Sequence, residues 1–341
     1  MPNGTLLFAK VVAKAESTYA GGSDSNLSSG ARRLTVAPTG VITLGREYDT
    51  GADRTVGIRT PVIGNRVTQT AENPEISIDA PAVTTDDLAI WLGAIEKTAG
   101  GTPTGTAAPY TWTRAIGLTS STNAPASLHA IVADGNQSYY VNGILPTSIT
   151  IGAEASGLTT LSGSFFAKSV AKTSVAPDDT LPSNANALAG RLWQLSYGTA
   201  FLSAGTSGGT AFSHLYSWSL EITSGFTPIN AQAGALTLAD YNQFGAGFGG
   251  TLTVTVASNT TAVTQLLDKL ASQTFWRLHW QNSGNTESAD ILVSAVPTSV
   301  TPISGDQDGI TTYEVELTLA YDATSGKVLE YQVKNGLSAL P

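Results

Sequence analysis

Two glycine motifs in the second half of the chain have the spacing of sites that bind nucleotides or cleave esters. Gly245–Gly250 has the spacing G-x-G-x-x-G, but a dinucleotide site needs those glycines between a strand and a helix. The next segment, Thr251–Val256, predicts a strand instead. Gly205–Gly209 has the G-x-S-x-G spacing of a serine hydrolase, which needs a buried strand before it and a helix after it. Its flanks are small and polar, so we interpret both motifs as loops and expect no enzyme and no catalytic residue.

Residues that bind metals are scarce. The chain has no cysteine, which excludes disulfides, thiolate metal sites and cysteine nucleophiles. Asp306-Gln307-Asp308-Gly309 resembles the start of a calcium loop but lacks the further oxygens of a full site. A hairpin turn explains the segment equally well, and the sequence leaves calcium at Asp306 and Asp308 open. His129 and His279 each follow a leucine within a strand pattern, which favours a structural role. We expect no cofactor and no metal site.

The most suggestive polar feature is a group of arginines within the long segment Gly45–Asn73. Arg46, Arg54, Arg59 and Arg66 fall within 21 residues. They belong either to a solvated loop or to a docking loop that pairs with acids on another subunit. A second long segment without periodicity, Ser224–Gly250, contains Tyr241, Phe244 and Phe248. Long irregular loops in compact domains are usually functional or ordered by a partner, so we expect these seven residues to make contacts between subunits.

The elements that would position these residues are mostly strands. Alternating apolar and polar residues indicate antiparallel sheet with one wet face. In the first half we expect strands at Arg33–Val36, Val41–Leu44, Glu75–Asp79, Ser127–Val132, Ser148–Gly152 and Thr159–Phe166. In the second half we expect them at Tyr216–Ile222, Ala235–Leu238, Thr251–Val256, Phe275–Trp280, Asp290–Val296 and Thr311–Ala320. Apolar stripes at helical spacing predict one helix per half: one with Thr85 as N-cap, acids in its first turn and the stripe Leu88–Ile95, and one after Thr261 with the stripe Val263–Leu270.

The chain contains two related halves. Leu145–Thr150 recurs as Val296–Thr301 and Gly157–Leu161 recurs as Gly309–Tyr313, with offsets of 151 and 152. Two copies at so long a period indicate a duplicated domain. The fold expected is mainly β: two tandem antiparallel β-sandwich or half-barrel domains, each with one amphipathic helix. The expected boundaries are an N-terminal arm at 1–33, a first domain at 34–180 with an insertion at about 97–125, a second domain at 181–326 and a C-terminal arm at 327–341, which could add an edge strand.

Composition narrows the class of protein. Charged residues make up 13% of the chain and the net charge is −9; a surface rich in Thr, Ser, Gly and Ala is common in assembled, β-rich extracellular or virion proteins. The charge is uneven: 11 acids and 4 bases lie from residue 200 onward, a net of −7, against 15 acids and 13 bases before it, a net of −2. Phosphate binding needs Lys and Arg, so an acidic chain is not expected to hold nucleic acid. The sequence shows no signal peptide and no apolar run of the ~20 residues that a membrane helix needs.

Three stretches resemble the tail tube proteins (major tail proteins) of long-tailed bacteriophages. The opening segment Leu6–Gly21, with its lysine, glutamate and Thr-Tyr pair, is similar to the start of these proteins, although Ala20 is inserted before the glycine. Tyr139–Ile151, together with Gly157–Phe166, resembles the long hairpin of the family. The strand and helix at Glu75–Glu96 resemble its core.

This resemblance implies a structural virion protein, located in the phage tail and, during assembly, in the host cytoplasm. Family members form rings of six domains that stack into a tube. For a chain with two tube domains, the resemblance implies homotrimeric rings, other tail proteins at the tube ends, and double-stranded DNA that passes through the lumen without specific binding. An alternative is a receptor- or glycan-binding β-domain with exposed aromatics, among them Trp112, Trp193, Trp218, Trp276 and Trp280.

The face of one predicted strand bears on this function. Glu314 and Glu316 alternate with Tyr313, Val315, Leu317 and Leu319 along Thr311–Ala320, so the two acids share one side of the strand. Because burying them unpaired would be costly, we expect them on the wet side, facing the lumen. Ser162 and Ser164 take their places in the first half.

Overall fold

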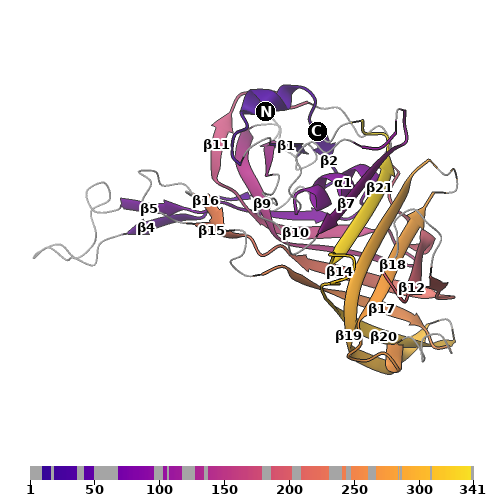
Figure 1. Cartoon of the computed structure of the whole chain (residues 1–341). Helices are drawn as coiled ribbons and strands as arrows, with labels where there is room; N and C mark the ends of the chain where they lie inside the picture. Colours follow the sequence, from indigo (N-terminus) through magenta and orange to yellow (C-terminus); the bar gives the residue numbers. More distant parts are fainter. Residues whose placement is uncertain are drawn as a thin grey trace, which may run out of the picture.

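The protein is described from a computed structural model, which covers residues 10–16, 19–36, 42–49, 68–95, 103–105, 107–116, 127–133, 137–178, 186–201, 209–229, 240–242, 247–259, 266–282, 284, 286–307 and 309–338. Strands dominate these residues, as the sequence predicts. Seventeen of the strands in the described part belong to one continuous, antiparallel sheet, and two short hairpins stand beside it (Figure 1). The fold is therefore mainly β.

The sheet contains β1 (Lys10–Ala15), β2 (Arg32–Leu34), β3 (Ile42–Thr43), β6 (Glu75–Ala80), β7 (Tyr110–Ile116), β8 (Leu128–Ala133), β9 (Ser138–Glu154), β10 (Thr160–Phe166), β11 (Ser169–Thr173), β12 (Trp193–Gly198), β13 (Thr210–Ala211), β14 (Leu215–Thr223), β17 (Gly249–Ala257), β18 (Thr274–Gln281), β19 (Ser288–Gln307), β20 (Ile310–Leu319) and β21 (Leu329–Asn335). The two hairpins are β4 (Arg46–Asp49) with β5 (Thr68–Glu72), and β15 (Thr227–Ile229) with β16 (Asp240–Asn242). The helices are α1 (Thr85–Gly93) and the short 3-10 turns η2 (Asp24–Ser28) and η3 (Gly190–Leu192).

Strand pairings follow the same order twice. In the first half, consecutive pairs run β2–β1–β8–β9–β10–β6–β3. In the second half they run β13–β12–β18–β19–β20–β17–β14. In addition, β11 pairs with β9 and β21 pairs with β19. The halves are joined where β14 pairs with β9 and where β21 pairs with β7.

The core lies between two layers of this sheet. β9 and β19 are long enough to take part in both layers: their first halves pair with β8 and β18, their second halves with β10 and β20. Buried apolar side chains from both layers and both halves form one cluster. Trp193 of β12 meets Trp218 of β14 edge-on, with ring centroids 4.7 Å apart. Aromatic side chains of this size each bury roughly 150–250 Å² in such a core.

The helix α1 begins one residue earlier than the sequence predicts. The N-cap is Thr84 rather than Thr85, because Thr84 has the extended backbone (φ −103°, ψ 168°) that a cap requires. Its Oγ1 accepts a hydrogen bond from the amide of Asp87 (3.2 Å), and the Asp87 carboxylate accepts one from the Thr84 amide (3.0 Å). The expected stripe Leu88–Ile95 is buried, but so are Thr85, Asp86 and Asp87. The helix is therefore enclosed on all sides rather than amphipathic. Trp91 packs against Phe165, with ring centroids 5.0 Å apart.

Both chain ends were expected to be arms, but the described residues of both contain strands of the sheet. Within 1–33, β1 pairs with β8 and buries Val11, Val12 and Ala13. Within 327–341, β21 is not an edge strand, since it pairs with β19 on one side and with β7 on the other. β7 lies in the insertion at 97–125 and buries Trp112, whose indole N–H donates to Asn335 Oδ1 and to the Leu337 carbonyl, both at 3.1 Å.

Two other expectations concern segments that the structure describes only in part. The strand expected at Ala235–Leu238 and residues 260–265 of the second helix lie outside the described residues. From Leu266 the chain runs in turns; Leu266 is buried, but Leu270 is 44% exposed, so the apolar stripe does not extend that far. The segments Gly45–Asn73 and Ser224–Gly250, expected to be irregular, contain the hairpins β4–β5 and β15–β16, of which β4–β5 projects from the body of the molecule (Figure 1).

Candidate assembly and nucleic-acid-facing surfaces

The larger layer consists of eight strands that pair consecutively: β3, β6, β10, the second half of β9, β14, β17, β20 and the second half of β19. One side of this layer is polar. Period-two alternation places every second residue on this polar face, and the register aligns them in rows. One row runs Asp79, Ser162, Thr150, Glu221, Thr251, Thr318, and the next runs Thr160, Gly152, Ser219, Thr253, Glu316, Ser299. A third row runs Glu154, Ser217, Thr255, Glu314, Thr301.

All charges on the polar face have one sign. Its ionisable residues are six exposed acids: Glu75, Asp79, Glu154, Glu221, Glu314 and Glu316. These eight strand segments contain no lysine, arginine or histidine. The remaining positions are mostly serine and threonine, and a shallow hollow of about 630 Å³ lies over β9 and β14. Such a surface carries a negative potential and offers phosphates no cationic partner.

The predicted alternation of β20 is confirmed. Glu314 and Glu316 are exposed, while Tyr313, Val315, Leu317 and Leu319 are buried. Sequence reasoning missed the other four acids of the polar face. The alternation of Glu75-Ile-Ser-Ile-Asp79 carried the same signal for β6, but the membership of Glu154 and Glu221 depends on the pairing of β9 with β14, which joins residues far apart in the chain.

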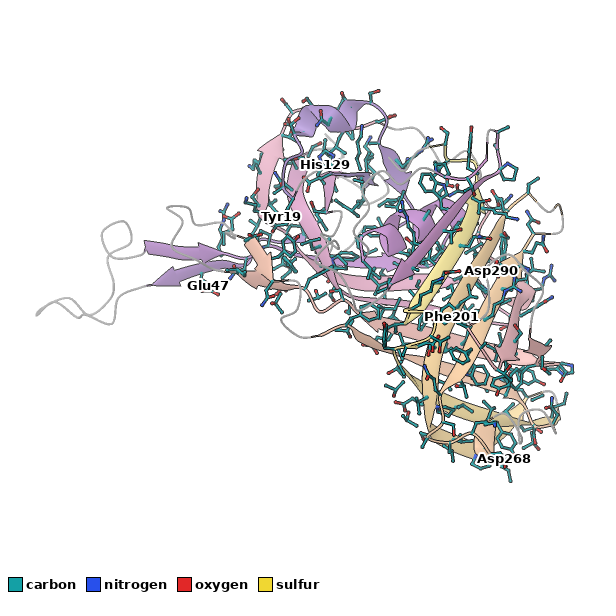
Figure 2. The ribbon with its side chains drawn as sticks, in the orientation of Figure 1. Tyr19, Glu47, His129, Phe201, Asp268 and Asp290 are labelled. Carbon is teal, nitrogen blue, oxygen red and sulfur yellow. The ribbon has the colours of Figure 1, made fainter. Side chains whose placement is uncertain are left out.

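Three of the residues predicted to contact other subunits are described, and they lie on the hairpins or near them. Arg46 pairs with Glu72 of the same hairpin, Nε to Oε2 at 3.1 Å. Tyr241 of β15–β16 packs on Tyr19 and Phe226, with ring centroids 4.8 and 6.0 Å away. Phe248 is half-buried against the main core. Arg54, Arg59, Arg66 and Phe244 lie outside the described residues. Figure 2 places Glu47 on the projecting hairpin and Asp268 at the opposite end of the molecule.

Two edges of the larger layer have a strand on one side only, among the described residues. β3 pairs with β6 alone, and β19 from Val296 onward pairs with β20 alone. Apolar side chains are exposed beside both edges: Leu44 after β3 is 37% exposed and Ile303 in β19 is 76% exposed. Strands with such unpaired backbone are templates for pairing with another chain.

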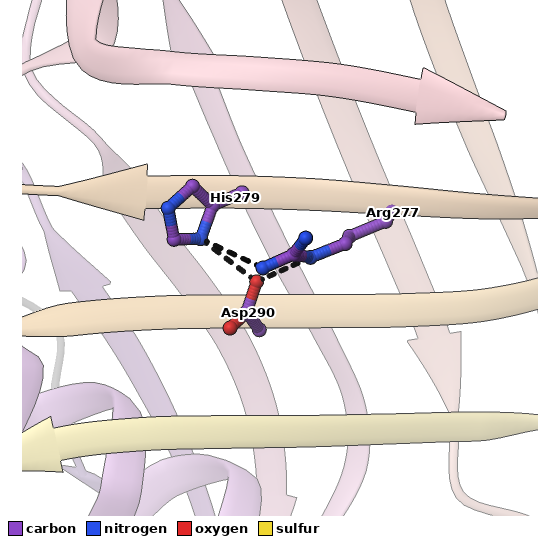
Figure 3. Close-up of polar contacts among 3 residues, drawn as sticks. All are labelled: Arg277, His279 and Asp290. Atoms are coloured by element: carbon purple, nitrogen blue, oxygen red, sulfur yellow. Dashed lines mark hydrogen bonds and ion pairs between the residues drawn. The ribbon is translucent and has the colours of Figure 1, made fainter. Parts of the chain in front are cut away.

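A buried ion pair lies on the other layer, where Arg277 and His279 of β18 both face Asp290 of β19 (Figure 3). Asp290 Oδ1 lies 2.7 Å from Arg277 Nε and 2.8 Å from His279 Nδ1. Burial alone would raise the pKa of Asp290, but the hydrogen bonds from His279 and Arg277 and the charge of Arg277 outweigh burial and lower it. A hollow of about 520 Å³ beside the pair is lined by Gln194, Gln281 and Lys334 among others. Because Arg277 and His279 both contact Asp290 Oδ1, we interpret the cluster as a structural ion pair.

The first half holds a neutral arrangement at the corresponding place. His129 of β8 is buried, and burial, followed by the charge of Lys14, lowers its pKa to about 4. Its Nδ1 lies 3.3 Å from the Tyr140 hydroxyl. Nearby, the Glu16 carboxylate accepts hydrogen bonds from the amides of Ala20 and Gly22, each at 3.1 Å, and from the Ser127 hydroxyl at 2.5 Å. These contacts fasten the segment after β1, which agrees with a structural role for His129.

The glycine motifs are described only in part. Gly249 and Gly250, interpreted in the sequence as loop residues, are the first two residues of β17, and Gly247 precedes that strand. Asp306 accepts a hydrogen bond from the Gly309 amide (3.1 Å) in the β19–β20 turn, and Asp308 lies outside the described residues. No group of three or more potential metal ligands occurs in the described part of the chain. None of the helices described there has the length and apolar character needed to cross a membrane.

No protein-family model matches the sequence, and no curated protein matches it at a significant level.

Proposed function

We propose that the protein is a structural subunit of a phage tail tube, in which three chains form a ring of six related domains and rings stack into a tube that conducts double-stranded DNA. The domain duplication is part of this proposal, and the repeated order of strand pairings supports it. The observation that carries the proposal is the polar face: eight strands from both halves present six acids and no base. A DNA conduit needs a wet wall that does not retain phosphates.

The number of strands in this layer agrees with the size of a DNA conduit. Three chains would supply 24 strands, which at ~4.8 Å spacing give a circumference of ~115 Å and a diameter of ~37 Å, larger if the strands tilt. Removing ~10 Å for side chains leaves a bore wider than a duplex of ~20 Å. The end partners would be other tail proteins that close the two sides of the stack.

Electron microscopy of the purified chain tests the proposal. Negatively stained samples over a range of protein concentrations should show rings or hollow tubes, with side-on views that repeat along the axis. Light scattering on the same samples should give particle masses in multiples of three chains. A chain that remains monomeric at every concentration would contradict the proposal.

The alternative, a receptor- or glycan-binding domain, loses the feature on which it depended. This alternative required exposed aromatic side chains, and each of its candidates is at most 4% exposed: Trp112, Trp193, Trp218, Trp276 and Trp280. Their rings fill the core instead. The ring centroid of Trp276, for example, lies 5.5 Å from that of Tyr197 and 5.6 Å from that of Phe212. No aromatic platform for a sugar is left among these five side chains.

A further inference from the structure

The junction between the two halves shows how one sheet can be continued by another. β14 of the second half pairs with the second half of β9, so that Glu221 lies opposite Thr150 and Ile222 lies opposite Ile149. Ile222 and Ile149 have no exposed surface. The junction therefore aligns polar residues on the polar face and buries apolar residues beneath it.

Register identifies the positions that correspond to this junction at the two unpaired edges. Ser162 in β10 corresponds to Glu314 in β20. Ser162 pairs with Asp79 of β6 and Thr150 of β9, and Glu314 pairs in the same way with Thr255 of β17 and Thr301 of β19. Thr301 and Val300 of β19 therefore stand where Thr150 and Ile149 stand in β9.

The other edge is placed in the same way. Ile42 pairs with Ile76, three residues before Asp79, and Leu220 pairs with Leu252, three residues before Thr255. Thr43 and Leu44 therefore stand where Glu221 and Ile222 stand in β14.

We infer that two copies of this chain join through these edges, with Thr43 of one copy opposite Thr301 of the next and Leu44 opposite Val300, antiparallel as in the β14–β9 junction. This inference rests on the proposed function in requiring self-assembly, and it adds the strands, the register and the direction of the contact. Because the two edges differ, the contact is head-to-tail, and such a contact either closes into a ring or runs on without limit.

The exposed apolar side chain of Leu44 at the β3 edge supports the inference that a strand of another copy covers this edge. Leu44 is 37% exposed, whereas Ile222, at the corresponding place, is completely buried. The edge of β19 is also interrupted: Pro302 has no N–H to donate, and Ile303 has a left-handed backbone with φ 59°. An interrupted edge pairs poorly with unrelated strands, which favours a matched partner over random aggregation.

Engineered cysteines test the register, because the chain has none of its own. Residues directly opposite in an antiparallel pair have Cα atoms about 4.5–5.5 Å apart, within the range of a disulfide. A mixture of chains carrying Thr43→Cys with chains carrying Thr301→Cys should form a covalent dimer on mild oxidation. The double variant should form linked species that end at three chains, if the ring closes.

Matched variants separate the possible outcomes. Glu221→Cys with Thr150→Cys reproduces the internal junction and should form an intrachain disulfide. Thr43→Cys mixed with Thr318→Cys, on a strand paired on both sides, should link at least tenfold more slowly than Thr43→Cys with Thr301→Cys. Equal rates for the two mixtures, with the internal control linked, would overturn the inference. If microscopy still shows rings in that case, the tube proposal stands and only these edges are wrong; if the chain is monomeric throughout, both fail.

Discussion

Asp86 is an acid that is buried without hydrogen bonds to its carboxylate from any described residue. Its side chain is enclosed in the first turn of α1, and neither carboxylate oxygen has a hydrogen-bond partner among the described residues. Burial raises the pKa to about 6; the charge of Arg32 lowers it, while Asp87 and Glu287 raise it further. The folded protein therefore binds a proton at Asp86 that the unfolded chain, with an ordinary carboxyl, has already lost. Stability must fall as the pH rises from about 4 to about 6.

Replacing Asp86 with asparagine should remove this pH dependence. Since a shift of about two pKa units corresponds to about 3 kcal/mol, we expect Asp86→Asn to raise the free energy of unfolding by about 1–3 kcal/mol at pH 7 and by little at pH 4. Urea unfolding of both proteins at the two pH values measures the difference. Asp79→Asn, at an exposed position of β6, is the control and should change stability by less than about 0.5 kcal/mol. Equal effects of Asp86→Asn at both pH values would show that Asp86 is not the titrating group.

Asp290 should behave in the opposite direction. Its pKa lies below the usual value because of Arg277 and His279, so its contribution is present above pH 4 and is lost as the pH falls through the lowered pKa. Asp290→Asn leaves Arg277 buried beside a neutral side chain, which typically costs about 3–5 kcal/mol. We expect a loss of that size at pH 7, measured by urea unfolding, that narrows in strong acid. A variant as stable as the parent at pH 7 would contradict this account of the ion pair.

The start of α1 offers a test at the scale of a single element. Thr84 caps the helix through its Oγ1, whereas the hydroxyl of the adjacent Thr85 is buried without a hydrogen-bond partner in the described structure. Thr84→Ala should therefore cost about 1–2 kcal/mol, and Thr85→Ala should be neutral or slightly stabilising, because it removes an unsatisfied polar group. Thermal unfolding of the two variants compares them directly. The reverse ranking would place the cap at Thr85.

The same two threonines show where the sequence was informative and where it was not. Alternation predicted β20, both of its faces and the positions of Glu314 and Glu316, because that pattern is local. The sequence could not decide whether Thr84 or Thr85 is the N-cap of α1, since the extended backbone of Thr84 is set by the strand and helix on either side. It also missed β4 and β5, because Arg46–Asp49 and Thr68–Glu72 have no apolar side to alternate.

Side-chain exposure was equally hard to judge without the fold. The tryptophans could have belonged either to a sugar-binding surface or to a core. The packing of β12, β14 and β18, and for Trp112 the pairing of β7 with β21, places them in the core. β7 was missed within the expected insertion at about 97–125, because its partner β21 lies more than 200 residues away. Pairing between strands far apart in the chain cannot be predicted from the local patterns of a single sequence.

For the whole assembly, the charge of the polar face is the property to change. Glu314→Lys combined with Glu316→Lys should leave ring formation intact, because both positions are exposed and paired through backbone, but should give the tube affinity for DNA. Binding of labelled duplex to assembled tubes should increase at least tenfold at low salt and fall again as salt rises. Comparing the single variants Glu314→Lys and Asp268→Lys, which change the net charge equally, separates the polar face from the remote surface. Equal DNA binding by those two would exclude a special role for this face.

The strand β7 has a consequence for how the protein is made. Its partner β21 and both hydrogen-bond acceptors of the Trp112 indole, Asn335 and Leu337, are among the last described residues to leave the ribosome. Until then Trp112 and one side of β7 have no partner in this sheet, so that a nascent chain cannot complete its first half before its second. Contacts of such long range slow folding and prolong the exposure of apolar surface. Ribosomes that stall or stop before residue 329 should therefore release chains that chaperones and proteases recognise, which keeps incomplete subunits out of the assembly.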